Sequence, residues 1–186
     1  MNTRMLGVAG MVGGLALLAV EIRELLESGS QPDGTNIDRI DSVGSLIWGL
    51  GMALAMWALS QLGATGRGRI ARAIPLIALV GFVIMAGSGL IEALGLVEPI
   101  NDPLAGPAWI LLLIGTLATG IMALVARTLP GWRRFTPLLC ILTVPPVFLL
   151  GPAAGPLFGV SWILLGLAVA TSGSDVPAAD PTPVSA

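Results

Sequence analysis

Three acidic side chains lie at the edges of long apolar segments, where a carboxylate could bind a proton or a cation. Glu21 and Glu24 are three residues apart, so they share one face of a helix. Arg23 is spaced to pair with Glu27, which leaves the other two carboxylates without a local cation. Glu92 has apolar residues on both sides. Because ionisable residues within membrane segments are candidates for function, Glu21, Glu24 and Glu92 form a candidate ligand or proton site.

The same carboxylates also have a purely structural interpretation. At about 1.5 Å per residue, Glu21 and Glu92 lie about 25–30 Å along their helices from Arg4 and Arg72. Both therefore fall near the same membrane interface, where water could hydrate them. Their matching depth leads us to expect that Glu21 and Glu92 approach one another. The sequence leaves the functional and the hydrated interpretations open.

Two adjacent prolines, Pro145 and Pro146, fall past the middle of the apolar segment Phe135–Leu150. Proline has no backbone N–H, so two carbonyls in the preceding turn lose their helical partners. In hydrocarbon these carbonyls need another donor, such as Thr143, a second helix or water. Broken helices line substrate sites in some transporters, and they also occur as plain kinks. We predict a kink or break within Ile141–Pro146.

The residue types that are absent exclude several kinds of chemistry. The chain has no His and no Tyr, and all nine of its basic residues are Arg. Without His there is no Ser-His-Asp triad and no histidine metal ligand, and without Lys there is no Schiff base. Cys140 is the only cysteine and lies among apolar residues, so we expect a buried, inert thiol. These absences predict a non-enzymatic protein without metal or cofactor, and the exclusive use of Arg indicates GC-rich bacterial coding.

The elements that position these residues are long apolar segments. Hydrophobic residues make up 55% of the chain and charged residues 11%, whereas soluble domains have about 25% charged residues. A membrane-spanning helix needs about 20 apolar residues. We therefore predict an all-α, polytopic transmembrane bundle of six helices over residues 1–171, followed by a disordered cytoplasmic tail over residues 172–186. The six segments are Met5–Leu26, Val43–Leu62, Ala73–Leu96, Pro107–Ala126, Phe135–Leu150 and Leu157–Thr171.

The last two segments are short for a membrane span, and the residues that connect them, Gly151–Pro156, are rich in Gly and Pro. The main alternative to six spans is therefore a re-entrant pair that enters and leaves the membrane on one side. In that arrangement only four segments would cross fully.

Arginine distribution predicts the orientation. With six spans, seven of the nine arginines lie on one side, and most acidic residues lie on the other. Basic residues are retained in the cytoplasm, so we predict a cell-membrane protein with both termini in the cytoplasm. Three helices have a tryptophan near the end that lies away from these arginines, and we expect these side chains at the outer membrane interface: Trp48, Trp109 and Trp162. The seven arginines are Arg4, Arg67, Arg69, Arg72, Arg127, Arg133 and Arg134.

Similar segments suggest three repeated helical hairpins. The third and fifth segments each open with an arginine followed three residues later by Pro75 or Pro137. The fourth and sixth share Trp-Ile-Leu-Leu, beginning at Trp109 and Trp162. Parallel repeats of this kind occur in some transporters. Membrane rules alone also place Arg, Pro and Trp at these positions, so convergence remains the alternative.

Small residues recur at four-residue spacing on the first two segments. Gly10 and Gly14 form a GxxxG pattern, and Ser45, Gly49 and Ala53 form a second ridge. Such ridges let helices approach closely. They serve either packing within one chain or a face that binds a second copy.

The leading functional prediction is a non-enzymatic accessory or partner-binding membrane subunit. The alternative is a small carrier or channel for a proton, cation or small solute with an outward-facing acidic site; a lipid-modifying enzyme ranks third. A polar cavity reached by Glu92 would favour the carrier, whereas an exposed small-residue ridge would favour the subunit. The expected partners are the lipid bilayer and either another membrane protein or a second copy. The net charge of −2 indicates no nucleic-acid partner.

Overall fold

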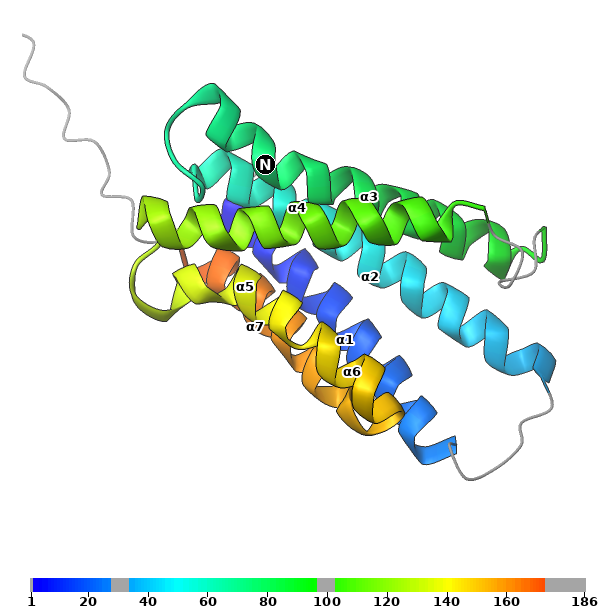
Figure 1. The fold of residues 1–186 in the computed structure, drawn as a ribbon. Coiled ribbons are helices and arrows are strands. Elements are labelled where there is room, and N and C mark those ends of the chain that lie inside the picture. The colour runs from blue at the N-terminus through cyan, green and yellow to red at the C-terminus, as the bar shows by residue number, and fades with distance from the viewer. Residues whose placement is uncertain (1, 28–33, 97–102, 173–186) are drawn as a thin grey trace, which may run out of the picture.

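The computed structural model describes residues 2–27, 34–96 and 103–172, and every regular element in these ranges is a helix. The predicted tail lies outside the described residues beyond Ser172. The α-helices are α1 (Thr3–Glu27), α2 (Gly34–Leu62), α3 (Arg69–Ala93), α4 (Ala105–Ala126), α5 (Thr136–Leu142), α6 (Val144–Leu150) and α7 (Gly155–Ser172) (Figure 1). Two short 3₁₀ helices, η2 (Gly131–Phe135) and η3 (Gly151–Ala154), flank α5 and α6.

Five helical stretches of the described chain are long and apolar enough to cross a membrane, which indicates a membrane protein. Four of them are α1, the part of α2 from Arg39, α3 and α4, and the fifth is the 42-residue stretch Gly131–Ser172. The predicted count of six spans is not confirmed. The reason is local, because the proline-containing segment divides into α5 and α6, which have seven residues each and are too short to cross alone.

The helices pack as a closed bundle. Contacts run from α1 to α2, from α2 to α3, from α3 to α4, from α4 to α5, from α5 to α7, and from α7 back to α1 (Figure 1). The two helices of each predicted hairpin are in contact, namely α1 with α2, α3 with α4, and α5 with α7. The third pair differs from the first two because its first helix is broken at Thr143, so the internal repeat stays a prediction.

Glycines on α1 let that helix approach its neighbours closely. A methyl group added at Gly14 would lie 2.6 Å from the backbone nitrogen of Ile163 in α7. One added at Gly10 would lie 2.9 Å from the Ala55 side chain in α2 and 3.3 Å from Gly166 in α7. Real methyl carbons do not approach so closely, so the GxxxG pattern is used for packing within the chain.

The second small-residue ridge is also used within the chain. A methyl group added at Gly49 would lie 2.8 Å from the backbone nitrogen of Ala86 in α3. Ala53, one turn further along α2, is buried. Two of the small positions therefore face neighbouring helices, which removes the argument that this ridge is an exposed face for a second copy.

Five aromatic side chains form the centre of one half of the bundle: Trp48, Phe82, Trp109, Phe158 and Trp162. Trp48 is 2% exposed and Trp162 0% exposed, so both side chains are buried between helices, and their level at the membrane interface stays a prediction. The two indole rings have centroids 5.7 Å apart and pack edge to face, a favourable aromatic geometry. Their side chains point toward the bundle axis, where they bury far more apolar area than they would at an interface. Trp109 is 36% exposed and lies at the rim of this cluster.

Candidate functional site

The break between α5 and α6 falls at Thr143, inside the Ile141–Pro146 stretch. Pro145 and Pro146 occupy the first turn of α6. The first backbone N–H groups of a helix have no acceptor within that helix, so prolines cost little there. The proline pair therefore starts a new helix rather than interrupting a continuous one.

A small buried polar network holds this break against α7. The Thr143 hydroxyl donates to the Cys140 carbonyl at 2.9 Å, and the Ser161 hydroxyl donates to the Phe158 carbonyl at 2.7 Å. The two hydroxyl oxygens lie 3.1 Å apart, and the Cys140 thiol donates to the Ser161 carbonyl at 3.4 Å. Cys140, Thr143 and Ser161 are all buried. The network satisfies its own polar groups, which is a packing role rather than a binding one.

Glu21 is the acidic residue that reaches a cavity. Its side chain is half-buried, and its carboxylate lies against Gly155, the first residue of α7. It lines a cavity of about 150 Å³. Among the described residues no side chain or backbone group donates a hydrogen bond to this carboxylate. The other residues that line the cavity are Trp109, Val144, Val147, Phe148 and Phe158.

Glu92 lies in a different environment, between α2 and α3. Its carboxylate accepts hydrogen bonds from the Ser42 hydroxyl at 3.2 Å and from the Ser88 hydroxyl at 3.4 Å. Both serines are buried, so the carboxylate joins the two helices. No hydrogen bond among the described residues joins Glu92 to Glu21, and the approach of the two carboxylates stays a prediction. Glu92 is a structural residue in this arrangement.

The remaining charges on α1 form an ion-pair group. Arg23 pairs with Glu27 at 3.1 Å, which confirms the pairing predicted from their spacing. The same guanidinium pairs with Asp41 of α2 at 3.0 Å, and this partner was not predicted because it comes from another helix. Glu24 is exposed on α1 and does not line the cavity that Glu21 lines. The three carboxylates predicted as one site therefore separate into one cavity residue, one structural residue and one surface residue.

Sequence reasoning missed the aromatic wall around Glu21. Trp109 was interpreted as an interface anchor, while Phe148 and Phe158 were taken only as apolar helix residues. Gly155 was noted only as part of a Gly- and Pro-rich connection. No spacing rule links these residues to Glu21 of α1, because they come from three other elements, α4, α6 and α7. Among the described residues there is no group of three or more His, Cys, Asp or Glu side chains that could hold a metal ion.

Comparison with known proteins identifies no relative. No family model matches the chain, no curated protein matches it and no solved structure matches it. The Glu21 cavity and its lining residues are therefore the basis for a functional assignment.

Proposed function

We propose that this chain is a non-enzymatic integral membrane carrier whose acidic site binds a small organic cation. The observation that carries the proposal is the Glu21 carboxylate, which lines a cavity together with Trp109, Phe148 and Phe158. A carboxylate attracts a positive charge, and aromatic faces bind ammonium groups through their π electrons. The combination suits a cation that also has apolar surface.

The shape and chemistry of the cavity favour an organic cation over a metal ion. A volume of about 150 Å³ exceeds the roughly 30 Å³ that one water molecule occupies, so a compact ammonium group has room. Hard metal ions need several oxygen ligands. Apart from Glu21, the lining side chains are valines and aromatic residues, which offer no oxygen. An alkylammonium group needs no such ligands because it is held by charge and apolar contact.

Access to the cavity is from the side of the bundle. Phe148 is 83% exposed and Trp109 is 36% exposed, so two of its walls lie at the outer surface of α6 and α4. In a membrane these surfaces face lipid. A lipophilic cation that concentrates at the membrane interface would then reach Glu21 laterally between the helices.

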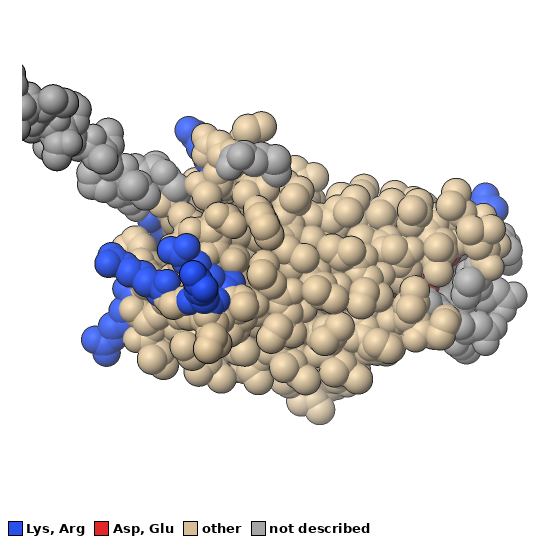
Figure 2. Space-filling model, turned by 90° about the horizontal axis from the view of Figure 1, so that it is seen from above, with Lys and Arg blue, Asp and Glu red and all other residues tan. Residues whose placement is uncertain are grey.

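The orientation of the bundle forms part of this proposal. Arginine side chains gather mainly at one end of the molecule (Figure 2), and the positive-inside rule assigns that end to the cytoplasm. Gly7 near the start of α1 packs against Ala170 near the end of α7. Under the proposal both termini are therefore cytoplasmic in a cell membrane, and Glu21, toward the far end of α1, belongs to the outer half.

The accessory-subunit prediction has less support from the fold. It depended on an exposed small-residue ridge, and positions in both ridges are covered by neighbouring helices of the same chain. The carrier prediction depended on a polar cavity reached by Glu92. The cavity that supports the present proposal differs from it, because Glu21 lines it and its other side chains are apolar or aromatic.

The test is cation binding by the purified full-length chain in detergent micelles. Tetramethylammonium is the probe, and 3,3-dimethylbutan-1-ol is a similarly shaped neutral control. We expect calorimetry to show binding of the cation and not of the alcohol. Glu21→Gln should weaken cation binding at least about tenfold, which corresponds to about 1.4 kcal/mol, whereas Glu24→Gln, which removes a neighbouring charge that does not line the cavity, should weaken it less. Equal binding of the alcohol, or an unchanged affinity in Glu21→Gln, would overturn the proposal.

Transport is tested separately with the chain reconstituted into liposomes. Uptake of radiolabelled tetramethylammonium should exceed that of protein-free liposomes and should fall to background with Glu21→Gln. Binding without uptake would identify a cation-binding protein that is not a carrier.

A further inference from the structure

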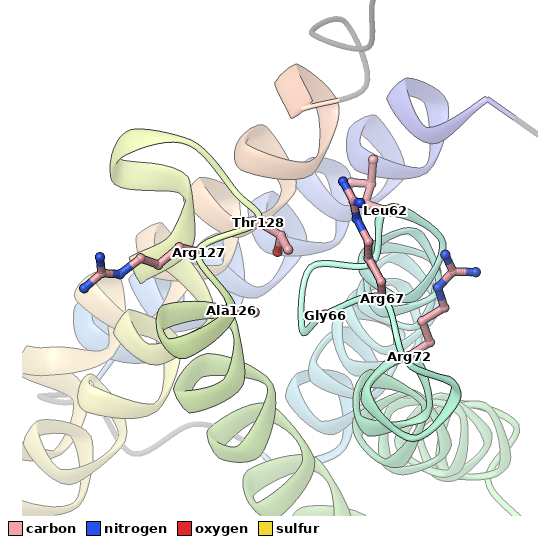
Figure 3. Close-up of a pocket in the computed structure, with 8 residues that line it drawn as sticks. Leu62, Gly66, Arg67, Arg72, Ala126, Arg127 and Thr128 are labelled. Atoms are coloured by element: carbon pink, nitrogen blue, oxygen red, sulfur yellow. The ribbon is translucent and has the colours of Figure 1, made fainter.

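A second cavity opens at the arginine-rich end of the bundle, far along the helices from Glu21 (Figure 3). Its volume is about 780 Å³. One wall comes from the end of α2 and the connection to α3, and the other comes from the end of α4. The lining residues are Leu62, Gly63, Gly66, Arg67, Arg72, Ala126, Arg127 and Thr128.

The charge of this cavity is of one sign. Arg67, Arg72 and Arg127 line it, and no acidic residue does. None of the three pairs with a carboxylate among the described residues. All three are exposed, and Figure 3 shows Arg67 and Arg72 on one side of the cavity and Arg127 on the other, with the Arg72 and Arg127 side chains extending in opposite directions. Guanidinium groups bind phosphate oxygens through paired hydrogen bonds.

The two walls are tied together by hydroxyl groups. Thr128, at the end of α4, donates a hydrogen bond to the Ala64 carbonyl on the opposite wall. Thr65 donates to the Ala71 carbonyl at 2.6 Å, which closes the connection between α2 and α3. The Thr128–Ala64 bond joins the two walls, and the Thr65–Ala71 bond lies within one of them. The cavity is therefore preformed, and this lowers the cost of binding.

Arg127 adopts a backbone conformation that favours glycine. It follows the last residue of α4 with a φ of 52°, in the left-handed region. Helices commonly end with glycine in this conformation because other residues are disfavoured there. Orientation in the membrane requires only positive charge on this side, which a lysine or arginine one residue away would also supply. An arginine at this position on the cavity wall points to a role in binding.

We propose that this cavity binds a phosphate group carried on a larger molecule, with Arg67, Arg72 and Arg127 as its basic lining residues. Its volume is much greater than inorganic phosphate needs, and Leu62 and Ala126 supply apolar wall beside the arginines. An anionic phospholipid headgroup and a soluble organic phosphate share this chemistry. Basic pockets at the cytoplasmic ends of helices are suited to the former.

The test measures the thermal unfolding of the purified full-length chain with three additives. These are dioctanoyl phosphatidylglycerol, glycerol 3-phosphate and dioctanoyl phosphatidylcholine. We expect phosphatidylglycerol to raise the Tm in a saturable manner and phosphatidylcholine to have little effect. A rise with phosphatidylglycerol alone identifies a lipid headgroup as the ligand, and an equal rise with glycerol 3-phosphate identifies a soluble phosphate. No saturable rise with either anionic additive would overturn the proposal.

Matched variants separate a built site from general attraction between charges. In the double variant Arg67→Gln/Arg127→Gln, the phosphatidylglycerol concentration that gives half of the maximal rise in Tm should increase at least tenfold. The control is Arg4→Gln/Arg69→Gln, which removes the same charge from the same end but from residues that do not line the cavity. An equal loss in both double variants would overturn the proposal. Arg127→Gly gives a second check, because it should raise the Tm without ligand while reducing the response to phosphatidylglycerol.

Discussion

The Glu21 carboxylate lies against Gly155 at the first residue of α7, in a space where a β-carbon could not fit. A glycine at this position lets the carboxylate approach the start of the helix, whose N-terminal dipole favours negative charge. The carboxylate then faces the aromatic residues of the adjoining cavity. Gly155 is therefore a positioning residue for the proposed cation site.

Gly155→Ala should displace the Glu21 carboxylate and weaken binding of tetramethylammonium. The added methyl group occupies the place of the carboxylate, so one of the two must move. We expect calorimetry to show an affinity about tenfold lower, which corresponds to about 1.4 kcal/mol of binding free energy. Gly106→Ala is the control, because nothing lies within 4 Å of a methyl group there. Equal affinities in Gly155→Ala and the wild type would show that Glu21 needs no such support.

Glu92→Gln should destabilise the bundle without affecting cation binding. The charged carboxylate accepts hydrogen bonds from Ser42 and Ser88, and hydrogen bonds to charged groups contribute about 1.5–3 kcal/mol. The glutamine oxygen is a weaker acceptor, so we expect a loss of roughly 1 kcal/mol in the free energy of unfolding. Denaturant titration in micelles measures it, and Glu24→Gln on the exposed face of α1 is the comparison. A large decrease in cation affinity would show that Glu92 contributes to the cation site.

Two glycines of α3, two residues apart, should respond to alanine in opposite directions. A methyl group at Gly87 meets nothing within 4 Å. Alanine has less backbone entropy than glycine to lose when the chain folds, so Gly87→Ala should stabilise the folded state by about 0.5–1 kcal/mol. A methyl group at Gly89 would lie 2.6 Å from the Ser42 carbonyl oxygen. Gly89→Ala should therefore cost about 1–3 kcal/mol. Thermal unfolding of both variants checks the packing of α3 on α2, and effects of the same sign would contradict it.

Single cysteines should report the orientation when introduced into a Cys140→Ser background. An impermeant maleimide added to intact cells should label a cysteine at Leu94 and should not label one at Gly68 or Gly131. Cys140→Ser keeps a donor for the Ser161 carbonyl, so the background should fold. Labelling at Gly68 from outside would reverse the orientation. A cysteine at Ser172 tests the last segment, because labelling there from outside would show that Gly131–Ser172 crosses the membrane once rather than twice.

The sequence by itself determined the features that depend on composition and local spacing. Apolar segment length identifies a helical membrane protein, because hydrocarbon requires backbone groups to be satisfied within each segment. The Arg23–Glu27 pair follows from one helical turn. The proline pair places the interruption of the fifth segment within a few residues, because proline removes helical hydrogen bonds from its own neighbourhood.

Only the tertiary structure decided which carboxylate faces a cavity and which tryptophans are buried. Glu21 and Glu92 have similar depths and similar apolar neighbours in the sequence, but one lies against a glycine and aromatic rings while the other lies between two serines. Trp48 and Trp162 could equally have faced lipid. Lipid tails are as apolar as a protein interior, so hydrophobicity does not distinguish the inner face of a membrane helix from its outer face. That choice depends on close packing between helices distant in the chain.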